Sequence, residues 1–167
     1  MNANGNKEVK TLRKMLLSFR TDVYEKIKSG VKIFEHRRNF PDEPIMAYMY
    51  VSSPVKAITG IVYLGKRHCL SDWLEDYKED SNAVTRIKEY MENYHYRYAM
   101  EIDSFQETSQ ISLNDLRKNV PSFVAPQMYT YLDGTELLEY IDNNLKMTGL
   151  QIKHSFERVG ACEVCMH

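Results

Sequence analysis

The sequence predicts an α+β protein with one domain, and three observations support this. Residues 45–51 form a short run that is apolar at both odd and even positions, as in a strand packed on both faces. Leucine and isoleucine side chains between residues 137 and 145 repeat at helical spacing. A length of 167 residues, of which 43% are hydrophobic, is enough to form one core.

The first elements follow a polar leader, residues 1–10, which we predict to be disordered. Residues 15–19 are apolar and predict a buried strand. Thr21 or Asp22 can cap a short helix after this strand. Gly30 ends the helix, because glycine readily adopts the left-handed conformation found at helix ends.

A strand crowded with charge follows Gly30. Glu35 and Arg37 are two residues apart, so on a strand they share one face and can form an ion pair. The guanidinium would keep donors free for a ligand. Lys32 joins the pair only if it lies in the turn after Gly30 or at a bulge.

Two strands are expected next, on either side of a turn at Ser52 and Ser53. Gly60, in the second of them, predicts a bulge or the close approach of another group to the backbone. Residues 70–94 then combine capping residues with apolar residues at helical spacing, which predicts a helical insertion. The insertion is either a lid over a binding cleft or a simple cover on the sheet.

The second half of the chain returns to strands and helices in alternation. Residues 96–105 predict a strand that carries Glu101. A capping pattern at Ser112 begins a helix, and residues 127–132 predict a further strand before the last helix. Residues 150–167 have little pattern and predict a loose tail or an edge strand.

The charged stretch Gly30-x-Lys32-x-x-Glu35-x-Arg37 resembles the signature of the ASCH domain, a branch of the PUA-like superfamily. The neighbouring strands, the Ser-Ser-Pro turn and the closing helix and strand are similar as well, so the resemblance spans about residues 12–133. It implies a small mixed β-barrel flanked by helices.

The resemblance implies a domain at residues 11–149, with residues 150–167 outside it. It also implies a ligand cleft beside the signature strand. Hydroxyl and amide groups near such a cleft suit base edges, because they both donate and accept hydrogen bonds, and a tyrosine can stack on a splayed base. The residues we expect to bind a ligand are Gly30, Lys32, Glu35, Arg37, Ser52, Ser53, Gln127 and Tyr129.

The interpretation we favour is a module that binds RNA, single-stranded or structured, or a modified nucleoside. Lys32 and Arg37 would contact phosphate or base, and Glu35 would organise them. Single-stranded RNA suits this site better than a duplex, because its bases can be turned out and stacked. No phosphate-binding GxxxxGK[ST] loop and no GxGxxG motif occurs, and we predict no cofactor.

Two alternatives stay open. Some short bacterial ASCH-like proteins are acetylcytidine amidohydrolases, and the resemblance would make Lys32 the catalytic lysine with Glu101 as an acidic partner. Those enzymes have threonine where this chain has Glu35, and a carboxylate near Lys32 favours its protonated form. The other alternative is a regulatory protein-interaction domain, such as a transcriptional or translational regulator.

Composition restricts the partners and the compartment. The formal net charge is −1, so any nucleic-acid site must be a local patch. Three cysteines, a polar first segment and no long apolar run predict a cytoplasmic protein without a membrane partner. Cys162, Cys165 and His167 offer three ligands where structural zinc needs four, so we predict no metal site. The sequence leaves the oligomeric state open.

Overall fold

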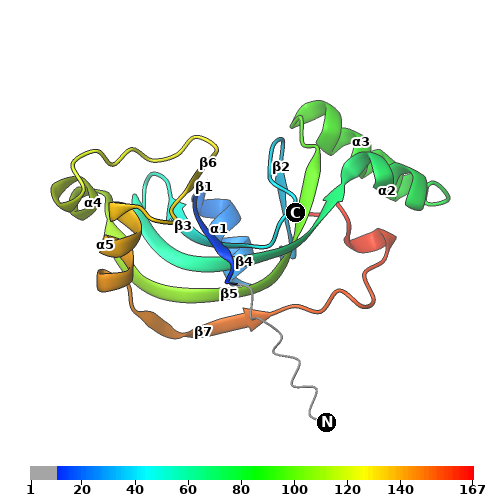
Figure 1. The fold of residues 1–167 in the computed structure, drawn as a ribbon. Coiled ribbons are helices and arrows are strands. Elements are labelled where there is room, and N and C mark those ends of the chain that lie inside the picture. The colour runs from blue at the N-terminus through cyan, green and yellow to red at the C-terminus, as the bar shows by residue number, and fades with distance from the viewer. Residues whose placement is uncertain (1–10) are drawn as a thin grey trace, which may run out of the picture.

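The computed structural model describes residues 11–167 and shows a strongly curved sheet with helices at its ends and against its concave side (Figure 1). The disordered leader expected at residues 1–10 lies outside the described residues. In chain order the elements are β1 (Arg13–Phe19), α1 (Thr21–Lys28), β2 (Phe34–Arg37), β3 (Ile45–Val51), β4 (Ala57–Cys69), α2 (Leu70–Asp76), α3 (Ser81–Asn93), β5 (Tyr98–Ser112), α4 (Leu113–Asn119), β6 (Tyr129–Tyr131), α5 (Glu136–Asn144), β7 (Met147–Lys153) and a 3-10 turn at Ala161–Glu163.

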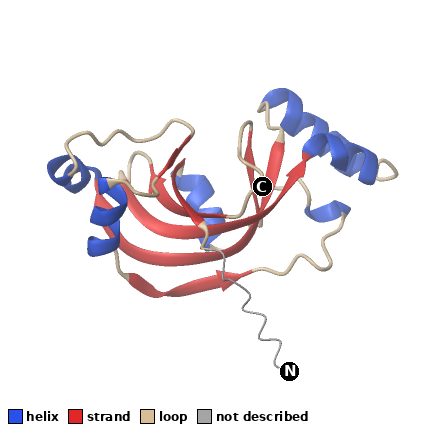
Figure 2. Ribbon diagram, in the orientation of Figure 1, coloured by secondary structure: helices blue, strands red, loops and turns tan. Residues whose placement is uncertain are grey.

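The strands form one mixed sheet in the order β2-β5-β4-β3-β1-β6, and β7 pairs with β5. The pair β1–β3 is parallel, and the other paired strands are antiparallel. The long strands β4 and β5 bend through the whole molecule and give the sheet the shape of a half-barrel (Figure 2). The predicted α+β class, with a curved mixed sheet and a helical insertion at residues 70–94, is confirmed.

Gly60 shows how a single residue shapes the sheet. The pairing of β4 with β5 shifts its register between Ile58 and Gly60, as the sequence predicts for this glycine. A Cβ atom at Gly60 would lie 2.8 Å from the Phe105 ring. Because real Cβ contacts are never that short, the close packing of Phe105 on β4 requires glycine here.

Three hydrophobic clusters hold the helices on the sheet. The first joins α1, through Tyr24 and Ile27, to the concave side of β1, β3 and β5. The second packs α4 and α5 against the other face. The third packs Trp73 of α2 and Ile87 of α3 against Phe34 of β2. The helical insertion therefore covers the β2 end of the sheet, where the charged strand lies.

The last segment of the chain returns to this same end. After β7, residues 154–167 cross to the insertion, and Val164 and Cys165 are buried in the third cluster. Arg86 of α3 donates hydrogen bonds to the carbonyl oxygens of Ala161, at 2.6 Å, and Val164, at 3.2 Å. Strand β7 runs across residue 149, and the domain boundaries stay a prediction.

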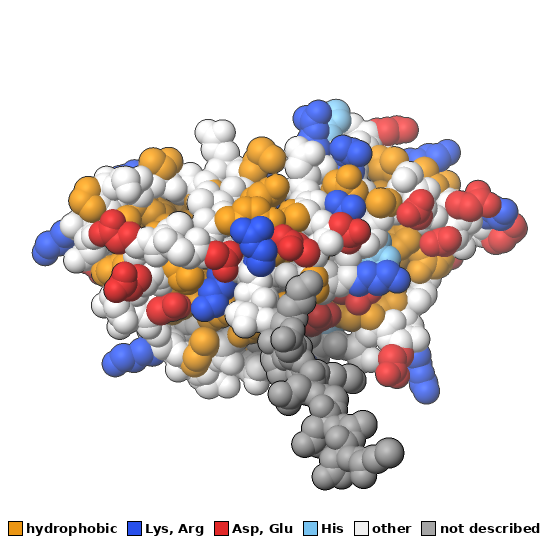
Figure 3. All heavy atoms as spheres, in the orientation of Figure 1, with side chains coloured by type: hydrophobic (Ala, Val, Ile, Leu, Met, Phe, Trp, Pro, Cys, Tyr) orange, Lys and Arg blue, Asp and Glu red, His pale blue; other side chains and the backbone are white. Residues whose placement is uncertain are grey.

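The surface carries mixed charge. On the face shown in Figure 3, acidic and basic side chains are interspersed, in keeping with the net charge of −1. Within residues 11–167, no helix combines the length and the apolar character that crossing a membrane requires.

Candidate functional site

The turn that precedes β2 positions the charged residues. Helix α1 ends at Lys28, and Gly30 adopts a left-handed conformation with φ of 81°. The Gly30 amide donates to the carbonyl oxygen of Ile27 at 3.1 Å, which closes the helix end. The chain reverses there, so Lys32 lies just ahead of the strand and Glu35 lies within it.

Glu35 and Arg37 share one face of β2, as their spacing predicts. Arg37 Nε lies 3.4 Å from Glu35 Oε1, and Arg37 Nη2 donates to the carbonyl oxygen of Ser18 at 3.0 Å. Glu35 is only 6% exposed. Within residues 11–167, its Oε2 atom has no hydrogen-bond partner. A buried carboxylate oxygen without a donor is costly, so this atom is a candidate acceptor for a ligand.

A cavity of about 280 Å³ lies against this pair. Its walls come from three separate parts of the chain: the end of β1 with the start of α1, the strand β2, and the end of α3 with the residues after it. The third wall consists of Tyr90, Tyr94 and Tyr96. A carboxylate, a guanidinium and three phenol rings therefore surround one space.

The tyrosines form an aromatic ladder with His36. Tyr94 stacks on Tyr96 with centroids 5.5 Å apart and planes at 21°, and Tyr96 stacks on His36 at 5.8 Å and 29°. Tyr90 meets the His36 ring edge-on at 5.0 Å. His95, between the stacked pair, has a φ of 57°, a strained conformation for a residue other than glycine. Tyr94, at the outer end, is 55% exposed.

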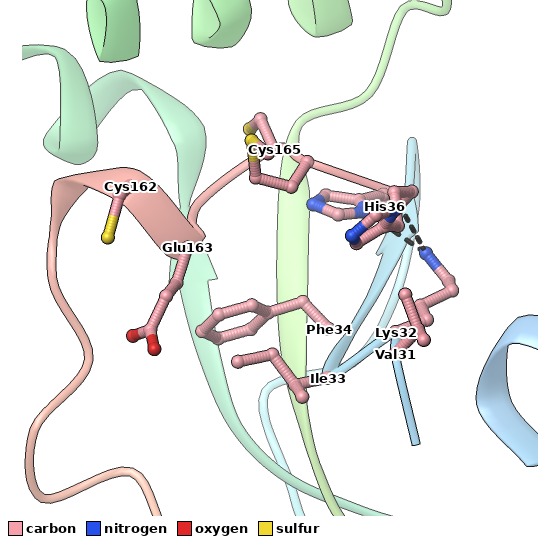
Figure 4. Close-up of a pocket in the computed structure, with 10 residues that line it drawn as sticks. Val31, Lys32, Ile33, Phe34, His36, Cys162, Glu163 and Cys165 are labelled. Carbon is pink, nitrogen blue, oxygen red and sulfur yellow. Dashed lines mark hydrogen bonds between the residues drawn. The ribbon is translucent and has the colours of Figure 1, made fainter. Parts of the chain in front are cut away.

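Lys32 faces a second cavity, of about 200 Å³, together with the last residues of the chain (Figure 4). It is 5% exposed. Its Nζ donates to the carbonyl oxygen of His167 at 2.9 Å and lies 3.4 Å from Nδ1 of His36. Burial lowers the pKa of Lys32, and the Glu35 carboxylate opposes that shift without cancelling it.

His36 separates the two cavities. Burial, reinforced by the Lys32 charge, lowers the pKa of His36 well below its ordinary value, so the ring is neutral at physiological pH. Within residues 11–167 its Nε2 atom, like Glu35 Oε2, is buried without a hydrogen-bond partner.

Several predicted site residues lie elsewhere. Glu101 contacts His68, with 2.7 Å between Oε2 and Nε2, and does not line the cavity of Lys32. Ser52 donates to the carbonyl oxygen of Phe19 at 3.3 Å. The remaining three are also outside both cavities: Ser53 and Gln127 are exposed, and Tyr129 packs edge-on against Phe40 and Tyr131. Of the predicted residues, Glu35 and Arg37 line one cavity, Lys32 lines the other, and Gly30 lines neither.

Sequence reasoning missed the tyrosines of the insertion. The one tyrosine among the predicted ligand-binding residues, Tyr129, lies outside both cavities. Tyr90 and Tyr94 are four residues apart on one helix face, and this spacing, among 12 tyrosines in the chain, was the available signal.

The cysteines near Lys32 do not assemble a metal site. Cys162 is exposed and Cys165 is buried, and Figure 4 shows Cys162 and Glu163 across the cavity from Lys32. Within residues 11–167, no group of three or more histidine, cysteine or acidic side chains is arranged to hold a metal ion.

Comparisons with known proteins identify the fold. No protein-family model matches the chain, and no curated protein matches it. Crystal structures of an ASCH protein from Zymomonas mobilis match with a TM-score of 0.62 and 21–22% sequence identity, over 80% of this chain and 96–99% of theirs. They include a variant with a tyrosine replaced by phenylalanine and one with a serine replaced by alanine. This match shows that the chain has an ASCH-type, PUA-like fold.

Proposed function

We propose that the protein is an ASCH-type binding module for single-stranded RNA, or for a modified nucleoside within it, and that it holds a base in the cavity between β2 and the end of α3. The observation that carries the proposal is the ladder of Tyr94, Tyr96 and His36 beside the Glu35–Arg37 pair.

Stacking suits this site for a physical reason. Every base offers a flat π face, and stacking on an aromatic side chain contributes about 1–3 kcal/mol per base. Tyr94 ends the ladder at the surface, so a base turned out of a strand can reach it without displacing the core. A duplex keeps its bases stacked on one another and cannot make this contact.

The charge of the chain also favours contact with one or two bases over binding through many phosphates. The chain has 22 basic and 23 acidic residues, and the arginine at the mouth of the cavity, Arg20, is paired with Asp22 at 2.6 Å. A module of this kind gains affinity from one or two bound bases and only a few phosphates.

The test is a fluorescence-anisotropy titration of a labelled single-stranded RNA hexamer. Tyr94→Ala and Tyr96→Ala should each weaken binding by about 1–3 kcal/mol. Tyr77→Ala, in the same insertion but outside the cavity, is the matched control and should bind as the wild type does. Equal affinity of all four proteins, or no binding by the wild type, would overturn the proposal.

A second candidate function is hydrolysis of an acetylated cytidine through Lys32. The observation in its favour is that burial lowers the pKa of Lys32, which a nucleophilic or basic lysine needs. Incubation of N4-acetylcytidine with wild type and with Lys32→Met, followed by mass analysis, tests it. Conversion to cytidine by the wild type alone would support this function, and no conversion would reject it.

A further inference from the structure

The Glu35 carboxylate has one buried oxygen that a purely structural role does not explain. Oε1 lies 3.4 Å from Arg37 Nε, but Oε2 has no hydrogen-bond partner within residues 11–167. The residue is only 6% exposed, and it lines the cavity walled by Tyr90, Tyr94 and Tyr96, the tyrosine cavity. A surface ion pair leaves its second oxygen to water. A buried one requires a donor, and a bound ligand can supply it.

Arg37 supplies the opposite polarity on the same face. Its guanidinium has five N–H groups. Nη2 donates to the carbonyl oxygen of Ser18 at 3.0 Å, and Nη1 reaches that of Met128 only at 3.5 Å. Nε is buried without a well-formed hydrogen bond among residues 11–167. The side chain lies over the Phe19 ring, at 5.2 Å, which fixes its position.

The acceptor oxygen of Glu35 beside the donor N–H groups of Arg37 complements the hydrogen-bonding edge of an unpaired base. The Watson–Crick edge of each unmodified base offers an N–H donor next to an acceptor: N3–H and O4 in uracil, or an exocyclic amino group and a ring nitrogen in cytosine and adenine. The Glu35–Arg37 pair has no net charge, so it suits a neutral edge rather than a phosphate.

We infer that Glu35 and Arg37 hydrogen-bond the free Watson–Crick edge of a base stacked on Tyr94, an inference that rests on the RNA binding proposed above. The ligand class is therefore an unpaired base of any sequence with an unblocked edge. Paired bases are excluded because their partners occupy that edge, and bases methylated at the ring nitrogen that carries the N–H, as in N3-methyluridine, are excluded because they lack that donor.

Three RNA hexamers test this with the wild-type protein alone: oligouridylate, the same chain with 5-methyluridine, and the same chain with N3-methyluridine. The two methylated bases have equal mass and are both neutral, and only the N3-methyl group removes the donor. The first two should bind equally, and the N3-methyl chain should bind about tenfold or more weakly, because it leaves Glu35 unpaired.

Variants of the protein then show which residue discriminates against the N3-methyl hexamer. Glu35→Ala should bind the three hexamers alike, whereas Glu25→Ala, an exposed glutamate of α1, should discriminate as the wild type does. Equal binding of all three hexamers by the wild type would overturn this inference and leave the RNA-binding proposal standing. Absence of binding to every hexamer would instead reject the RNA-binding proposal. Discrimination retained in a folded Glu35→Ala would show that another residue reads the edge.

Discussion

His36 lies where the two cavities meet, with Lys32 on one side and Tyr90 and Tyr96 on the other. Burial lowers its pKa well below the ordinary value, so the folded protein holds the ring neutral where the unfolded chain would protonate it. The unfolded state therefore binds more protons than the folded state in the range just below the unfolded pKa of about 6.5, and stability falls as pH falls through that range.

We expect His36→Gln to reduce this pH dependence. The free energy of unfolding, measured by urea denaturation at about pH 7.5 and about pH 5.5, should fall less in the variant than in the wild type. His154→Gln is the comparison, because burial lowers the pKa of His154 too but that side chain is only half-buried. The His154→Gln variant should reduce the pH dependence of the free energy of unfolding by less. If the free energy of unfolding fell equally with pH in wild type and His36→Gln, His36 would not be the source of the pH dependence.

At the scale of residues, the sequence predicts contacts between side chains that are close together along the chain. Glu35 and Arg37 meet because residues two apart share a strand face, which is a local property. Glu101 and Lys32 are remote in sequence, and spacing cannot show that Glu101 pairs with His68 instead. The unpaired oxygen of Glu35 depends on burial by several elements, so it was visible only in the structure.

At the scale of elements, we expect the returning C-terminal segment to control access to Lys32. Its carbonyl at His167 accepts from Lys32, and Arg86 of α3 holds the segment in place through two carbonyl oxygens. Hydrogen bonds from a charged donor contribute about 1.5–3 kcal/mol each, so the two bonds from Arg86 attach this segment to α3.

Arg86→Ala should loosen the segment and expose Lys32. Acetylation of Lys32 by acetic anhydride, followed by mass spectrometry of its peptide, should then proceed about tenfold faster or more, because the lost bonds shift the opening equilibrium by over about 1.4 kcal/mol. Lys88→Ala, an exposed change on the same helix, should leave the rate as in wild type. If all three proteins react alike, the segment does not control access.

The elements themselves were largely predictable, and their docking was not. The left-handed Gly30, the cap at Ser112 and the register shift at Gly60 follow from local residue chemistry. Strand β7 has mostly exposed side chains and no clear alternation, so periodicity left both a loose tail and an edge strand open for residues 150–167. The insertion was predicted as helical, but that it carries Tyr90 and Tyr94 into the cavity depends on how α3 packs on β2.

At the scale of the whole molecule, the half-barrel brings three distant parts of the chain to one cavity. β2 supplies the polar pair, the end of β1 supplies Arg20 and the Ser18 carbonyl, and the end of α3 supplies the rings. The resemblance over about residues 12–133 predicted the fold correctly, since ordered strands and turns define a topology. A fold does not specify a ligand, because binding depends on particular side chains.

Photo-crosslinking tests the central claim most directly. A single-stranded RNA hexamer containing 4-thiouridine would be irradiated with the full-length protein, and the attached peptides identified by mass spectrometry. We expect adducts in residues 90–96 and in β2, and their loss when Tyr94→Ala replaces the wild type. Adducts confined to other parts of the surface, or unchanged by Tyr94→Ala, would show that the tyrosine cavity is not where the protein binds RNA.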